Sequence, residues 1–478
     1  MIKKIFKFFA IFFLSCLGGI YLSFVGFYKW EELQIENNEA IHKSISSHST
    51  MSHRIIPLNE GPLSLAKRLE IIESAKNSIE LEFFIYDLDF ASQLITKALI
   101  KKAQEGVRVR MLIDFSLPVF KLKPIYASFL KERGVEVKYY NTSELYKIFS
   151  VQHRSHRKLL IVDDIKVITG GRNISNDYFN LSQNYNFLDS DIYLEGEISK
   201  SIRESFDVYW NSKLAEDSGL TSKVTNEELQ KAKAFINISE TDKALDENVN
   251  ILKKDILKNE ESFACNDITF VTDLPGVSLE NRRVYKTLEV LLQKTEARVF
   301  AESPYFVLRK DGLDLLQKMD SRNINLTVLT NGLYSTDAYY TISALYNVLD
   351  DLENTKINLF SYNGKRPAIK YELPVENSTR WGTHSKRAII DSDTFVIGTY
   401  NIDPRSANLN SELIIVCKGN VELVEHTMSD MSARVKNSLP IVQNEELFLD
   451  NLLVGSTFKQ RVKFYTAIPF ARLFDFLL

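Results

Sequence analysis

Two octapeptides of this chain follow one pattern: residues 156–163 read HRKLLIVD, and residues 384–391 read HSKRAIID. Both fit H-x-K-x-x-x-x-D, in a chain with only seven histidines among its 478 residues. One such match can arise by chance, but two copies in the two halves of one chain indicate an internal duplication.

The sequence around the octapeptides repeats as well. Each is preceded by the same order of short apolar strands and helical stretches. In the first half we expect strands at 79–86, 107–114 and 135–141, with a helix that runs through Ala103; in the second we expect strands at 298–306, 324–331 and 357–363, with a helix at 313–319. Strands that alternate with helices predict α/β halves, each with a mainly parallel sheet covered on both faces.

Within each octapeptide, the period of a strand places the His and Lys side chains on one face, because they are two residues apart. Glycine-containing turns follow, GGRN at 170–173 and GTYN at 398–401. The amides of Asn173 and Asn401 can donate to phosphate oxygens without adding charge. Two His, two Lys and two Asn brought together across a pseudo-twofold axis would cradle one phosphodiester, with no need for a metal or other cofactor.

With these paired H-x-K-x4-D and G-x-x-N motifs, the chain resembles the phospholipase D superfamily over roughly residues 57–419. Longer strings are most similar to bacterial cardiolipin synthases: GGRNI (170–174), ESPYFV (302–307), LTNG (329–332) and GTYNIDPRSANLNSE (398–412). It departs from the family pattern at Thr383 and Gly332. The resemblance implies two pseudo-symmetric α/β halves packed around one shared active site, and phospholipids as substrates.

The resemblance also implies roles for individual residues. His156 is expected to attack phosphorus and form a phosphohistidine, while His384 protonates the leaving oxygen; pseudo-symmetry leaves the reverse assignment open. The oxygens of the phosphate would be held by Lys158, Lys386, Asn173 and Asn401. Aligning Gly196 with Gly419 places Asp189 opposite Glu412, and we expect these carboxylates to accept hydrogen bonds from the histidine rings. The remaining motif members, Asp163 and Asp391, are grouped with the catalytic motif but are expected to tie strand to turn rather than touch substrate.

The N-terminus has the pattern of a membrane segment. Lys3, Lys4 and Lys7 precede an uncharged run from Phe8 to Tyr28, and about 20 apolar residues span a bilayer. Residues 1–30 are therefore predicted to form a transmembrane anchor, with a cleaved signal peptide as the alternative. The flanking charges place the bulk of the chain in the periplasm, at a bacterial inner membrane.

The remaining chain divides into four parts: a first half at 52–215, a polar connector at 216–261, a second half at 262–450 and an amphipathic tail at 451–478. We expect the connector to be solvated. The tail either lies in a membrane interface or packs on the second half, with Pro469 breaking its helix.

Composition limits other functions. The 59 basic and 62 acidic residues nearly cancel, so binding to nucleic acid is not expected. Cys16, Cys265 and Cys417 are odd in number and far apart, which argues against a disulfide framework and a cysteine zinc site. His153 lacks the neighbours of a metal ligand. Arg172 and Arg405 either bind anionic head groups or pair with local carboxylates.

The sequence thus favours a phosphatidyltransferase that makes cardiolipin from phosphatidylglycerol and a second phospholipid. A hydrolytic phospholipase D and a nucleic-acid phosphodiesterase would use the same centre. A membrane-tethered binding module that only retains the fold is the alternative from a different class.

Overall fold

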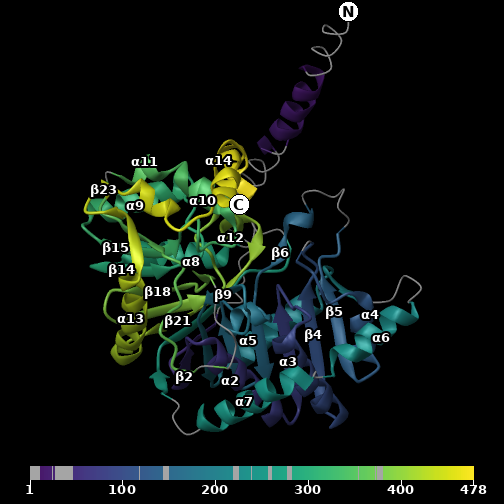
Figure 1. The fold of residues 1–478 in the computed structure, drawn as a ribbon. Helices are drawn as coiled ribbons and strands as arrows, with labels where there is room; N and C mark the ends of the chain where they lie inside the picture. Colours follow the sequence, from purple (N-terminus) through teal and green to yellow (C-terminus); the bar gives the residue numbers. More distant parts are fainter. Residues whose placement is uncertain are drawn as a thin grey trace, which may run out of the picture.

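The computed structural model describes residues 11–23, 25–26, 47–117, 119–143, 150–218, 225–237, 240–256, 261–276, 282–353, 355–371, 373 and 380–477. They form two α/β halves, the first drawn in blue and teal and the second in green and yellow (Figure 1). The prediction of two repeated halves is confirmed by a shared strand order.

The first half is built on a nine-stranded sheet in the order β11-β5-β4-β3-β7-β8-β10-β2-β12. Its strands are β2 (His53–Leu58), β3 (Ser78–Phe83), β4 (Arg108–Asp114), β5 (Val135–Tyr140), β7 (Leu159–Val162), β8 (Lys166–Gly170), β10 (Asp191–Glu195), β11 (Ala215–Asp217) and β12 (Phe263–Cys265). Its helices are α2 (Gly61–Ser74), α3 (Phe90–Gln104), α4 (Pro124–Lys131) and α5 (Ile198–Trp210).

The second half repeats seven of these strands in the same order. Its ten-stranded sheet runs β1-β13-β21-β19-β18-β14-β15-β16-β22-β23. The strands are β1 (Ser47–Ser49), β13 (Ile268–Thr272), β14 (Arg298–Glu302), β15 (Asn325–Asn331), β16 (Asn358–Tyr362), β18 (Arg387–Ile390), β19 (Thr394–Gly398), β21 (Leu413–Lys418), β22 (Ser438–Gln443) and β23 (Glu446–Leu447). The helices are α8 (Arg283–Lys294), α9 (Lys310–Ser321), α10 (Tyr339–Tyr346), α11 (Leu349–Leu352), α12 (Pro404–Asn408), α13 (Val421–Lys436) and α14 (Phe458–Leu473).

The expectation of mainly parallel sheets is wrong. Among the seven repeated strands of each sheet, the described residues pair in parallel only in β3-β4-β5 and in β14-β15-β16. The strands that carry the octapeptides, β7 and β18, pair antiparallel with both neighbours. Short turns join β7 to β8 and β18 to β19, and a short turn can connect only antiparallel strands.

Both faces of each octapeptide strand are buried, which explains the continuous apolar run that follows each His-x-Lys. In β7, Leu160 and Val162 face the outer helices of the first half, whereas Leu159 and Ile161 face the other sheet. The residues that face the other sheet form one core with their counterparts from β18 and β19, such as Ile389. The two sheets therefore pack face to face through a single apolar layer.

The connector is not simply solvated, contrary to expectation. It forms α6 (Asn226–Phe235) and α7 (Glu240–Ile256), and both pack on the first half (Figure 1). Ala232 and Val249 are buried in its core, and Lys253 lies 2.7 Å from Glu73 of α2. The polar composition of the segment hid an apolar stripe on each helix.

The argument against disulfides is also wrong for one pair. Cys265 of β12 and Cys417 of β21 are bonded, 152 residues apart in the chain. The first cysteine belongs to one sheet and the second to the other, so sequence spacing alone could not reveal their approach. The bond links the two halves covalently.

The purple helix at residues 11–23 extends away from the two halves in Figure 1, and the end of this helix that carries Tyr21 lies beside the C-terminal region. Residues 11–23 are helical, and Tyr21 contacts Phe474 with ring centroids 5.4 Å apart. Much of the expected membrane anchor lies outside the described residues, and no described helix is both long and apolar enough to span a bilayer. In the tail, α14 continues through Pro469 and buries Phe464, while Phe458 and Phe470 remain exposed.

Candidate active site

The two octapeptides meet between the halves, and backbone pairing across the halves sets their positions. Just before His156, β6 (Arg154–Ser155) pairs in parallel with β20 (Asn410–Ser411) of the second half. Just before His384, β17 (Arg380–Thr383) pairs in parallel with β9 (Tyr185–Leu188) of the first half. Each histidine is thereby held next to the segment of the other half that carries a carboxylate.

These carboxylates are Asp189 and Glu412. Nδ1 of His156 lies 3.1 Å from both carboxylate oxygens of Glu412, and Nδ1 of His384 lies 2.6 Å from Oδ2 of Asp189. All four side chains are buried. With Nδ1 held in this way, Nε2 is the ring nitrogen left to react in each imidazole.

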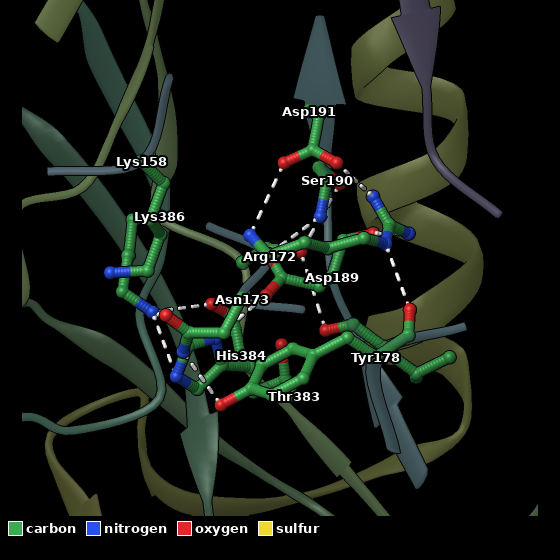
Figure 2. Close-up of polar contacts among 12 residues, drawn as sticks. Lys158, Arg172, Asn173, Tyr178, Asp189, Ser190, Asp191, Thr383, His384 and Lys386 are labelled. Carbon is green, nitrogen blue, oxygen red and sulfur yellow. Dashed lines mark hydrogen bonds and ion pairs between the residues drawn. The ribbon is translucent and has the colours of Figure 1, made fainter. Parts of the chain in front are cut away.

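A lysine accompanies each histidine. Nζ of Lys158 donates to the carbonyl of His156 at 2.7 Å, and Nζ of Lys386 donates to the carbonyl of His384 at 2.6 Å. Lys386 also lies 3.3 Å from Nε2 of His384 (Figure 2). Both ammonium groups therefore lie beside the imidazoles, where the charge of a bound phosphate would fall.

Burial disfavours the charged form of every group in this site. It lowers the pKa of Lys158 to about 7, helped by the charge of Lys386, and lowers the pKa of Lys386 to about 8. Burial and then the charges of both lysines lower the pKa of His156 and of His384. Burial raises the pKa of Glu412 to about 7 and does the same for Asp189. A dianionic or monoanionic phosphate would offset the cost of keeping two lysines charged here.

The two asparagines differ in their surroundings. Asn173 accepts from the backbone N–H of Ile85 at 3.1 Å and donates through Nδ2 to the hydroxyl of Tyr178 at 2.9 Å (Figure 2). The amide oxygen of Asn401 is buried and has no hydrogen-bond partner within the described residues. Asn401 is thus the freer of the two to turn toward a ligand.

Asp163 and Asp391 lie at the far ends of β7 and β18, seven residues beyond the histidines, or about 20 Å at the rise of a strand. Each has a positive φ, 53° and 54°, and accepts from three consecutive backbone N–H groups. The donors are residues 76–78 for Asp163 and 296–298 for Asp391. These contacts are the ones expected of residues that tie strand to turn.

Other predicted residues lie beside the centre. Arg172 is fully buried and pairs with Asp191 at 3.1 Å while donating to four backbone carbonyls, so its guanidinium is not available to a head group. Arg405 donates to Gln152 and to the carbonyl of Leu477. His153 is buried, and burial lowers its pKa to about 4. Within the described residues, no cluster of His, Cys, Asp and Glu side chains could hold a metal ion.

Sequence reasoning missed a supporting layer of buried carboxylates. Glu82 accepts from the hydroxyl of Ser155 at 2.7 Å, and Glu302 accepts from that of Thr383 at 2.5 Å. The two hydroxyls immediately precede the two histidines, so this contact orients each motif. A signal was present, because Glu82 and Glu302 are acidic residues at equivalent positions of the repeated strands.

Aromatic rings also wall the site. Phe187 lies 4.8 Å from the ring of His384, Tyr178 lies 5.2 Å from it, and Phe84 lies 5.2 Å from the ring of His156. These rings restrict the motion of the imidazoles and limit access of water.

Comparison with known proteins agrees with this architecture. Residues 69–210 and 288–435 match a family described as "Cardiolipin synthase, PLD-like domain", and together they cover more than half of the chain. One segment falls in each half.

Individual relatives are more distant. The chain is 29% identical over 387 residues to an uncharacterized protein of Helicobacter pylori strain J99, covering 76% of this chain and 75% of that one. It is 25% identical to cardiolipin synthase 1 of Bacillus anthracis, over 81% and 67% of the two chains, and 23% identical to cardiolipin synthase C of Escherichia coli K12, over 75% and 80%. The crystal structure of phosphatidylserine synthase from Haemophilus influenzae Rd KW20 shares the fold, with a TM-score of 0.64, 14% identity and coverage of 89% and 95%.

Proposed function

This chain belongs to the family of phospholipase D-like cardiolipin synthase domains, and from that premise we propose that it transfers a phosphatidyl group onto phosphatidylglycerol to make cardiolipin. The observation that carries the proposal is the crossed pairing of each His with a carboxylate of the other half. Two imidazoles prepared in the same way suit a reaction that needs a nucleophile and an acid in one step, and an acid and a base in the next.

In the first step, neutral His156 attacks phosphorus through Nε2, and the bond to the leaving alkoxide breaks. The negative charge of the bound phosphodiester opposes the burial and the lysine charges that lower the pKa of His384, so His384 is protonated in the complex. It gives its proton to that alkoxide, and a phosphohistidine remains. In the second step, His384 takes the proton of the incoming glycerol hydroxyl, whose oxygen attacks phosphorus and releases His156. Two displacements give net retention at phosphorus.

The remaining residues act on charge and orientation. Lys158, Lys386, Asn173 and Asn401 bind the nonbridging oxygens and stabilise the charge that develops on them. Asp189 and Glu412 fix the tautomer of the imidazoles and stabilise each imidazolium. The two histidines could also act in the reverse roles. Identifying the histidine that carries the phosphatidyl group in the intermediate decides between the two assignments.

We also propose that an N-terminal apolar segment tethers the enzyme to a bacterial inner membrane, with the catalytic halves in the periplasm. The lysines before residue 8 and the acidic residues at 31 and 32 support this orientation. The Cys265–Cys417 bond supports it too, because disulfides persist in oxidising compartments.

The test uses the purified full chain in detergent, given phosphatidylglycerol with and without phosphatidylethanolamine and analysed by lipid mass spectrometry. We expect cardiolipin from the intact chain and a loss of several orders of magnitude in His156→Ala and His384→Ala. Free glycerol or ethanolamine identifies the donor. Phosphatidic acid as the only product would make the protein a hydrolase. Activity that is unchanged in both variants would not come from this site, and the protein would then be a binding module.

A further inference from the structure

An apolar cavity lies in the second half, between the outer face of the sheet and the helices α8 and α9. Its cavity volume is about 200 Å³, and it is open to solvent. Lys386 of the catalytic centre lines it, together with Asp403 and exposed Asp311. The remaining walls are largely Leu, Val, Ala, Ile and Met.

The strands that line the cavity carry smaller side chains than their first-half equivalents. In the first half, Leu81 and Leu160 lie opposite each other across β3 and β7, and both are fully buried. The equivalent pair across β14 and β18 is Ala301 and Ala388, and both line the cavity.

The neighbouring strands show the same replacement of large side chains by small ones. Met111, which pairs with Leu81, corresponds to Val328, which pairs with Ala301. Ile168, beside Leu160, corresponds to Val396, beside Ala388. All four first-half residues are buried in the core of that half, whereas all four second-half residues line the cavity.

The helices that cover the two sheets also differ in how deeply their apolar side chains are buried. The apolar residues of α2 in the first half, such as Leu65 and Ile72, are fully buried. Several of those of α8 and α9, namely Leu288, Leu292 and Leu315, are only partly buried. Protein interiors are normally filled to crystal-like density, so a hollow kept in one of two repeated cores indicates a ligand.

The position of the cavity relative to the centre indicates which ligand. Lys386, Ala388 and Ile390 share one face of β18, and from the first to the third this face extends about 13 Å at the rise of a strand. A ligand bound here would place a charged end at the catalytic lysine and an apolar end under α8 and α9. This is the shape and polarity of a phosphate ester with a hydrocarbon chain.

We propose that this cavity holds one acyl chain of the phospholipid whose phosphodiester binds at His156 and His384. The inference rests on the proposed function, because it takes a phospholipid as the substrate. Each buried methylene strengthens binding by roughly fourfold, so long chains bind better than short ones as the cavity fills.

The test restores the first-half side chain in Ala388→Leu and in the double variant Ala301→Leu/Ala388→Leu. Ala297→Leu is the matched control, because it adds the same side chain at an exposed position of the same half. We expect Ala388→Leu to lower kcat/KM for dipalmitoyl phosphatidylglycerol at least tenfold, mainly through KM. Turnover of dihexanoyl phosphatidylglycerol and of bis(4-nitrophenyl) phosphate should change less than twofold, as in Ala297→Leu. Equal long-chain kinetics in Ala388→Leu and Ala297→Leu would overturn the proposal.

A second measurement uses the unsubstituted chain, so that it does not depend on folding of a variant. Phosphatidylglycerol with a diazirine at the end of one acyl chain is photolysed on the protein, and the labelled peptides are identified by mass spectrometry. We expect labels on α8 and α9 that excess dipalmitoyl phosphatidylglycerol suppresses; labels confined to other elements would refute the site. Failure of the proposed function is distinguishable, since it gives no cardiolipin from the wild type whatever the labelling pattern.

Discussion

The imidazole of His384 and the carboxylate of Asp189 come from opposite halves and meet at 2.6 Å between Nδ1 and Oδ2 (Figure 2). The parallel pairing of β17 with β9 brings them together, because it ends at Thr383 and Leu188, the residues that immediately precede them. Neither half can therefore form a complete histidine–carboxylate pair alone. The shared centre explains why the fold requires both copies of the repeat.

We predict that Asp189→Asn lowers kcat about 10²–10⁴-fold with a smaller change in KM. An amide in this position can donate to Nδ1 and favours the wrong tautomer, so Nε2 is no longer presented correctly. Glu412→Gln should have the same effect through His156. Steady-state kinetics on phosphatidylglycerol measures the split between kcat and KM.

The fold of these variants should be intact, because Asn and Gln keep the size of the native side chains. Circular dichroism and the melting temperature check this. Kinetics of Asp189→Asn indistinguishable from wild type would contradict the orienting role of the carboxylate.

A second prediction concerns pH. The pKa of Lys158 is lowered to about 7 and that of Lys386 to about 8, so both ammonium groups lose their charge as the pH rises through this range. We expect kcat/KM to fall between about pH 7 and 9, because neutral amines bind phosphate less well. Lys158→Arg stays charged and should move the alkaline limb to higher pH.

Lys166→Arg is the matched control, since Lys166 donates to Ser74 outside the site.

The contribution of Lys158 to the free energy of unfolding should rise with pH, whereas kcat/KM falls. Because the pKa of Lys158 in the folded state lies below its ordinary 10.5, the unfolded chain binds more protons between about pH 7 and 10.5. This group therefore makes the free energy of unfolding rise with pH in that window. An alkaline limb at the same pH in wild type and Lys158→Arg would exclude Lys158 as its source.

Much of the fold could be predicted from the sequence, because the repeat contains each strand twice and the two copies can be compared. The expected strand at 107–114 is observed as β4, and the expected strand at 324–331 is observed as β15. Strand direction could not be predicted in this way, because β7 and β18 are apolar on both faces whether their neighbours run parallel or antiparallel.

For the candidate site too, the repeat predicted some features and not others. The repeat aligned Asp189 with Glu412, and the structure brings each to the histidine of the other half. The Cys265–Cys417 bond and the cavity beside Ala388 depend on distances between elements far apart in the chain. No local pattern reports such distances. The substitution of Leu by Ala at equivalent repeat positions was visible, but its meaning needed the packing of α8 and α9.

A third prediction separates the motif aspartates from the chemistry. Backbone N–H donors lower the pKa of Asp163 against the opposing effect of burial. Asp163→Ala removes the acceptor and should lower the free energy of unfolding by roughly 1.5–3 kcal/mol. Asp163→Asn keeps one acceptor oxygen and tolerates the positive φ, so it should be less destabilising. We expect kcat per folded molecule to stay within a few-fold of wild type in both variants, and a loss comparable to His156→Ala would place Asp163 in the catalytic step.

The last prediction concerns the bond between the halves. Cys265 and Cys417 close a loop of about 150 residues, and the chain-entropy relation for such a loop gives about 5 kcal/mol of stabilisation. Cys265→Ser/Cys417→Ser should therefore unfold at lower denaturant concentration than wild type, and dithiothreitol should lower the midpoint of wild type alone. Among the described contacts, none joins a catalytic group to either sulfur. We therefore expect kcat at low temperature to be preserved. Alkylation of unreduced cells followed by mass spectrometry measures the state of the pair in its own compartment. Quantitative alkylation of both cysteines would contradict both the bond and the periplasmic orientation that it supports.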